Sequence, residues 1–192
     1  MKLGCCVHNF NSWTFEEAVR LTHDLGFRFG NIGLGPLGGI EAVLRDPDAV
    51  AARIRDAAQA HGFDFRELMV FAISPVEGAS DPLASAAERF DTICRCMASA
   101  GLTSILGSLS VPPLEGASES EAKAHRVTSL KRAVRIANEH GLELNIEPGF
   151  TGELVKKPET ALELLDDVPG LGLSLDFCHF LAAGVPQEDG FR

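Results

Sequence analysis

Three features that mark common classes of protein are absent from this sequence. It has no C-x-x-C motif, no excess of basic residues and no apolar run long enough to cross a membrane. The formal net charge is −10, whereas nucleic-acid-binding proteins usually carry a basic face that displaces counterions from phosphates. These absences argue against a nucleic-acid partner and a membrane anchor. The basic cluster Lys131, Arg132 and Arg135 is interpreted as the solvated face of a helix.

Cysteine is present, but its distribution does not predict disulfides. The number of cysteines is odd, and the pairs Cys5/Cys6 and Cys94/Cys96 are too close in sequence for an ordinary bridge, which leaves Cys178 alone. Thiols that stay reduced are typical of the cytoplasm. The N-terminal segment MKLGCCVHNF is too short for a signal peptide. We therefore expect a cytoplasmic protein.

A joint between helix and strand recurs along the chain. At five places a helical pattern ends in glycine and passes directly into an apolar strand pattern, at Gly26, Gly62, Gly101, Gly141 and Gly170. Glycine suits the left-handed residue that closes a helix, so each joint predicts the end of a helix and the start of a strand. Alternation of this kind predicts a parallel α/β sheet.

The joints, together with serine, threonine and proline at helix starts, give approximate bounds. Strands are predicted near 2–10, 27–34, 63–71, 102–110, 142–150 and 171–177. Helices are predicted near 14–25, 47–61, 82–100, 118–140 and 158–168. Residues 33–46 contain a G-x-G-x-x-G match without an immediate helix, and we expect a flexible loop there. No linker composition divides the chain, so residues 1–192 are interpreted as one domain.

The polar residues within the strands favour one closure of the sheet over another. In LELNIEP the aliphatic residues share one strand face, while Glu143, Asn145 and Glu147 share the other. Asp176 lies on the polar face of the last strand. An open sheet with helices on both sides would bury these polar groups, whereas a barrel can direct them toward its axis. The sequence therefore predicts a (β/α)8 TIM barrel, of which this chain holds about six βα units, with strands 7 and 8 absent.

Glu147, Asp176 and His8 fall at the C-terminal ends of their strands, where barrel active sites are built. Neighbouring strands are ~4.8 Å apart, so Glu147 and Asp176 can approach each other closely. Two like charges at 4 Å cost roughly 4 kcal/mol at an effective dielectric constant near 20. A shared proton, an arginine from a loop or a divalent cation could offset that cost. A cation is the simplest solution, and Mn²⁺, Mg²⁺, Co²⁺ and Zn²⁺ all suit carboxylate and histidine ligands.

The segments NIEPGF and SLDFCHFLAAG resemble the sugar phosphate isomerase/epimerase family. That family has the xylose isomerase-like TIM barrel, which it shares with metal-dependent apurinic endonucleases. The resemblance implies that Glu147 is a metal ligand and catalytic base and that Asp176 is a second metal ligand. It also implies a catalytic role for His179, which corresponds to a histidine that contacts substrate oxygen in epimerases and zinc in the endonucleases. Gly149 departs from the pattern, because many relatives have histidine there.

The resemblance also implies two further ligands, a histidine on strand 7 and a glutamate on strand 8. This chain stops at QEDGFR, so we expect a C-terminally truncated barrel whose 192 residues do not complete a four-ligand site. With the edges of the first and last strands unpaired, self-association into a homo-oligomer or aggregation is expected.

The implied activity is divalent-metal-dependent isomerisation or epimerisation of a sugar or sugar phosphate in carbohydrate metabolism. A glutamate removes a proton beside the carbonyl, and the metal stabilises the resulting enediolate. His8 and His179 are candidates for substrate contacts. Two alternatives are an inosose dehydratase-like lyase on the same barrel and a catalytically incomplete fragment. An endonuclease-like phosphodiesterase is disfavoured, because the segments RFGNIGL, RELMVF and SILGSLS contain no histidine.

Overall fold

The computed structural model describes residues 3–7, 10, 12–110, 116–147, 158–182 and 184, and in them strands alternate with helices. The strands are β1 (Cys5–Cys6), β2 (Phe29–Gly33), β3 (Asp64–Ile73), β4 (Ser104–Leu109), β5 (Glu143–Ile146) and β6 (Leu171–Leu173). The helices are α1 (Phe15–Asp24), α2 (Ile40–Arg45), α3 (Pro47–His61), α4 (Pro82–Ala100), α5 (Glu119–Glu139), α6 (Pro158–Asp167) and α7 (Phe177–Ala182), with a 3-10 helix, η2 (Gly35–Leu37), after β2.

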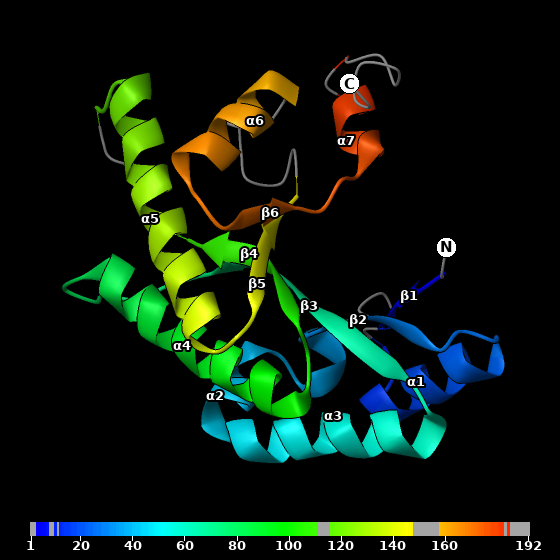
Figure 1. Ribbon diagram of the computed structural model, residues 1–192. Coiled ribbons are helices and arrows are strands. Elements are labelled where there is room, and N and C mark those ends of the chain that lie inside the picture. Colours follow the sequence, from blue (N-terminus) through cyan, green and yellow to red (C-terminus); the bar gives the residue numbers. More distant parts are fainter. Residues whose placement is uncertain are drawn as a thin grey trace.

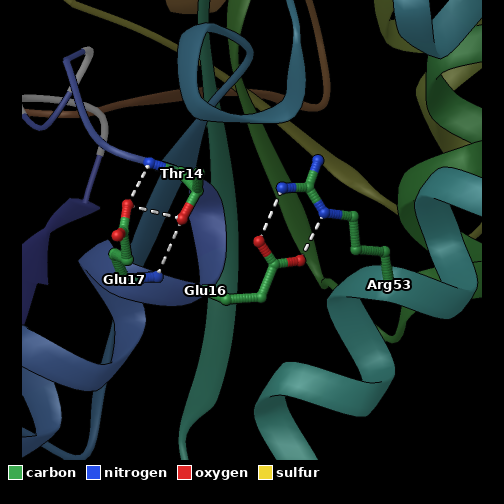
Figure 2. A network of polar contacts seen from close by, with 4 residues as sticks. All are labelled: Thr14, Glu16, Glu17 and Arg53. Carbon is green, nitrogen blue, oxygen red and sulfur yellow. Dashed lines mark hydrogen bonds and ion pairs between the residues drawn. The ribbon is translucent and has the colours of Figure 1, made fainter.

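The five long helices begin and end within one residue of the predicted bounds. Their termini carry the expected signals. Gly62 and Gly101 follow α3 and α4 with left-handed backbone angles, φ 57° and φ 91°. At the start of α1, the Glu17 N–H donates to the Thr14 hydroxyl oxygen, and the Glu17 carboxylate accepts from the Thr14 N–H at 3.0 Å (Figure 2). Local capping chemistry therefore sets these boundaries.

The prediction of a flexible loop at residues 33–46 is wrong. This segment forms η2 and α2, and α2 contacts α3 and α4. Leu37 and Val43 are 2% and 0% exposed, so the segment packs against the core through its own apolar side chains. The Arg89 guanidinium of α4 also donates to the Glu41 carboxylate of α2 at 2.7 Å.

The strand order establishes how the sheet is wound. Within the described residues the sheet has six strands in the order β1-β2-β3-β4-β5-β6, and every neighbouring pair is parallel. A doubly wound sheet reverses its strand order at a switch point, and this sheet does not. Right-handed crossovers in one direction place the helices on one side, and Figure 1 shows α3, α4 and α5 following one another along that side. The architecture is a partial barrel, as predicted.

The register aligns one row of apolar residues across the sheet, from β2 to β6. Each member is the register partner of the next one on the adjacent strand: Ile32, Leu68, Ile105, Leu144 and Leu171. The first four are 0% exposed and Leu171 is 8% exposed, because the helices cover this side of the sheet. This apolar row is the centre of the core.

Polar contacts link neighbouring helices around the outside of the sheet. Arg53 of α3 pairs with Glu16 of α1 through both of its carboxylate oxygens (Figure 2). Arg55 of α3 donates to the Ser99 carbonyl of α4. His140, the residue after α5, pairs with Asp91 of α4. Lys123 of α5 pairs with Glu163 and Asp167 of α6. None of the described helices is both long and apolar enough to cross a membrane.

Candidate metal centre

The candidate site lies where β5 and β6 end. Glu147 follows β5 directly, and Asp176 lies between β6 and α7. The two strands are parallel neighbours, with Ile146 opposite Leu173, so their C-terminal ends open toward the same edge. His179 comes from α7. One ligand atom from each of Glu147, Asp176 and His179 lies within 4.8 Å of the others.

Strand β6 ends earlier than predicted, and Asp176 explains why. The predicted strand ran to residue 177, whereas β6 ends at Leu173 and α7 begins at Phe177. The Cys178 N–H donates to Asp176 Oδ1 at 2.8 Å, and the His179 N–H donates to the Asp176 carbonyl at 3.1 Å. Asp176 therefore acts as the N-cap of α7. Its capping turns the chain back on itself and places His179 Nε2 3.8 Å from Asp176 Oδ2.

Glu147 is the more enclosed of the two acids. Its side chain is 13% exposed, whereas that of Asp176 is 43% exposed. His179 Nε2 lies 3.6 Å from Glu147 Oε1. Burial raises the pKa of Glu147, the neighbouring His179 opposes that effect, and the negative charge of Asp176 adds to it. The Glu147 carboxylate is thus destabilised in its ionised form.

Asp176 is shifted in the opposite direction. Its pKa is lowered, first of all by the hydrogen bond from the Cys178 N–H, with a smaller contribution from His179. The pKa values of the two neighbouring acids therefore move in opposite directions, because one acid is buried and the other caps a helix. Such a separation of pKa values is typical of carboxylate pairs with different chemical roles.

The donor set fits a divalent cation. Metal–oxygen and metal–nitrogen bonds are ~2.1 Å long, so two ligands of one ion lie up to ~4.2 Å apart. The separations of 3.6 Å and 3.8 Å fall within that limit. In the part of the chain that the structure describes, Glu147 and Asp176 form ion pairs with His179 and with no lysine or arginine. Among the described residues, the cluster therefore presents two carboxylates and an imidazole to a cation.

Beneath the cluster lies a lumen layer, which we define as Glu67, Ser104, Asn145 and Gly172. Asn145 Nδ2 donates to Glu67 Oε2 at 3.1 Å, and Ser104 Oγ donates to the same oxygen at 3.3 Å. Asn145 lies opposite Gly172 in the register of β5 and β6. Sequence reasoning placed Asn145 on the polar face but missed Glu67. The available signal was a charged residue directly before the apolar run LMVF of β3.

The position of one predicted site residue cannot be compared with the others. His8 lies outside the described residues. The preceding residues of its strand are placed, with Cys6 opposite Asn31 of β2. Burial raises the pKa of Cys6, and the charges of Glu67 and Glu147 add to this effect, so this end of β1 borders the same lumen. All five cysteines are free thiols.

A family model described as "Xylose isomerase-like TIM barrel" matches residues 19–191. The chain belongs to the xylose isomerase-like TIM barrel family. A curated protein of similar sequence is the uncharacterized protein MJ1311 of Methanocaldococcus jannaschii, which is 33% identical over 82 residues. That match covers 41% of this chain and 28% of MJ1311. The family assignment confirms the predicted fold.

Solved structures of similar fold include several enzymes. The probable 3-DHS dehydratase AsbF of Bacillus anthracis gives a TM-score of 0.77 at 16% identity, over 100% of this chain and 68% of that one. The IolI protein with a bound zinc atom gives 0.73 at 19% identity, over 98% and 67%. D-psicose 3-epimerase of Clostridium cellulolyticum H10 with D-tagatose gives 0.73 at 15% identity, over 94% and 65%. This chain therefore spans about two thirds of the length of these structures.

Proposed function

We propose that this chain carries part of the active site of a divalent-metal-dependent isomerase or epimerase that acts on a sugar or sugar phosphate. The observation that supports this function most strongly is the convergence of Glu147, Asp176 and His179 at the ends of β5 and β6. Structures of similar fold include a zinc-bound protein and a ketose epimerase, which agrees with this proposal.

The three residues are suited to different tasks. Asp176, whose lowered pKa favours the ionised form, would hold the cation through Oδ2, since Oδ1 caps α7. Glu147, whose pKa is raised by burial, is poised to accept a proton from the carbon next to the substrate carbonyl while also contributing a ligand oxygen. His179 lies beside both acids and can donate a hydrogen bond to a substrate oxygen. A bound cation would polarise the carbonyl and offset the negative charge that develops on it.

A lyase of the dehydratase type is the second candidate. The same proton removal begins a dehydration when the next carbon carries a hydroxyl that leaves as water. AsbF, which is described as a probable 3-DHS dehydratase, matches this chain over its whole length with a TM-score of 0.77. Both candidates require Glu147 as the base, so they differ in what happens after the proton has been removed.

The shared step can be tested directly by deuterium exchange. With Mn²⁺ in D₂O, the protein should exchange the proton at C3 of D-fructose or D-tagatose, which NMR detects whatever the final product. Glu147→Gln should reduce the exchange rate at least ~100-fold, because the amide cannot accept the proton. Glu143→Gln makes the same change on the same face of β5, four residues earlier and exposed, and should leave the rate unchanged. Exchange at the wild-type rate in Glu147→Gln would reject this assignment.

A further inference from the structure

The lumen layer joins four strands through the side chains of Glu67 and Asn145. Asn145 of β5 donates through Nδ2 to Glu67 Oε2 of β3 at 3.1 Å, and Ser104 of β4 donates to that oxygen at 3.3 Å. On its other side, Asn145 faces Gly172 of β6. A Cβ atom added at Gly172 would lie 2.1 Å from Asn145 Oδ1, so the asparagine side chain occupies the space that a side chain at 172 would need.

The part of the chain that holds Asp176 has little support from the sheet. β6 contains three residues, and after Leu173 the described backbone link to β5 is the Ser174 N–H donating to the Ile146 carbonyl at 2.9 Å. Two residues later, Asp176 presents a negative charge beside that of Glu147. Without a cation these charges repel each other, and the contacts beneath them must keep the two segments together.

Asn145 lies in the position from which such support can come. It precedes Glu147 by two residues on the same face of β5, and its oxygen packs directly against the backbone of β6. Its Glu67 hydrogen bond fixes which way the amide points, with Nδ2 toward β3 and Oδ1 toward Gly172. Both Nδ2 and Oδ1 of Asn145 are therefore in contact with neighbouring strands, directly below Glu147 and Asp176.

We propose that Asn145, held between Glu67 and Gly172, is a positioning residue that sets the separation of Glu147 and Asp176 and thereby the affinity of the site for a divalent cation. This inference rests on the proposed metal-dependent function. It assigns to Gly172 the role of leaving room for the amide and to Glu67 the role of orienting it. Outer-shell residues that hydrogen-bond metal ligands typically change metal affinity 10- to 100-fold when they are replaced, and Asn145, which acts through the packing of the strands, is expected at the lower end of that range.

The experiment is a Mn²⁺ titration of the full chain, with the dissociation constant as readout and the melting temperature recorded in parallel. Asn145→Ala should weaken Mn²⁺ binding about tenfold. Asn138→Ala makes the same change on the exposed outside of α5 and should leave Mn²⁺ binding unchanged. Glu67→Leu should weaken Mn²⁺ binding about as much as Asn145→Ala does. Glu67→Gln, which keeps an acceptor oxygen, should retain most of the Mn²⁺ affinity.

Gly172→Ala provides a test of the contact itself. Alone it should weaken Mn²⁺ binding, because its Cβ collides with Asn145 Oδ1. Added to Asn145→Ala it should cost little more, because the colliding atom is gone, so the two effects should be strongly non-additive. If Gly172→Ala does not fold, Asn145→Ala and the two Glu67 variants still decide the question.

The outcomes separate this inference from the function beneath it. A folded Asn145→Ala variant with the wild-type Mn²⁺ affinity, alongside a Glu147→Gln variant that has lost binding, rejects the positioning role and leaves the metal site standing. A lower melting temperature with unchanged Mn²⁺ affinity shows that the layer serves stability alone and also rejects the role. A wild-type chain that binds no Mn²⁺ rejects both proposals.

Discussion

Two rows of residues, one position apart on the same strands, have opposite characters. The apolar row contains Ile32, Leu68, Ile105 and Leu144, all fully buried against the helices. One residue earlier on each strand, the lumen side has Asn31, Glu67, Ser104 and Glu143, which are also partners in register. A shift of one residue exchanges the two sides of a strand. The helix side supplies stability, and the lumen side is left to hold polar groups.

The largest expected effect is on the helix side. Leu144→Ala leaves a cavity in the apolar row and should lower the free energy of unfolding by about 2–5 kcal/mol. Asn145→Ala, on the next residue and the opposite side, should lower it by only about 1 kcal/mol, the usual contribution of one hydrogen bond. Urea denaturation followed by circular dichroism measures both. Equal losses in the free energy of unfolding would contradict the proposed difference between the helix side and the lumen side.

A smaller effect is expected at the surface link between α1 and α3. The hydrogen bond from Arg53 holds the pKa of Glu16 below its usual range. Glu16 is about half exposed, so Glu16→Gln should cost only about 0.2–1 kcal/mol at pH 7. Because the pKa is lower in the folded state, this stabilisation is complete above the unfolded pKa and is lost as the pH falls through the folded pKa.

The difference between wild type and Glu16→Gln should therefore shrink as the solution is acidified. Melting temperatures between pH 7 and pH 3 measure it. Asp56→Asn, on the exposed face of α3, is the matched control and should show no such convergence. A difference that stays constant down to pH 3 would mean that the ion pair does not stabilise the fold.

The smallest expected effect has the opposite sign and lies on the lumen side. Burial raises the pKa of Glu147, so its ionised form destabilises the metal-free fold above the folded pKa. In the presence of a chelator, Glu147→Gln should melt about 1–2 °C above the wild type at pH 8. This advantage should disappear as the pH falls below the unfolded pKa, since Glu147 is then protonated in both states. A lower melting temperature at pH 8 would contradict the assigned cause.

Much of the fold could be predicted because its signals are local. Capping residues and closing glycines determine the long helices within one residue, and the alternation in β5 correctly separates Leu144 from Asn145. The convergence of Glu147 and Asp176 follows from parallel strands that end at one edge. These predictions required only neighbouring residues and the regular geometry of a parallel sheet.

The parts that could not be predicted depend on irregular or distant contacts. Simple alternation puts Phe65 and Glu67 on one side of β3. The register shifts there, however, so that Phe65 packs on Phe15 of α1 while Glu67 reaches Asn145 across the lumen. Such a bulge reverses the side on which the following residues lie. Alternation also predicts that Asp176 is a strand residue, whereas its side chain hydrogen-bonds to the backbone as a helix cap and β6 ends early.

The two oxygens of Asp176 have different partners. Oδ1 caps α7, whereas Oδ2 lies beside His179, so folding and ion recognition depend on different atoms of one carboxylate. Asparagine caps helices about as well as aspartate does, but it carries no charge. Asp176→Asn should thus preserve the start of α7 and the place of His179 while it weakens the attraction for an ion. Asp176→Ala would remove both the helix cap and the negative charge. Comparison of the two variants therefore distinguishes the loss of the α7 cap from the loss of the charge.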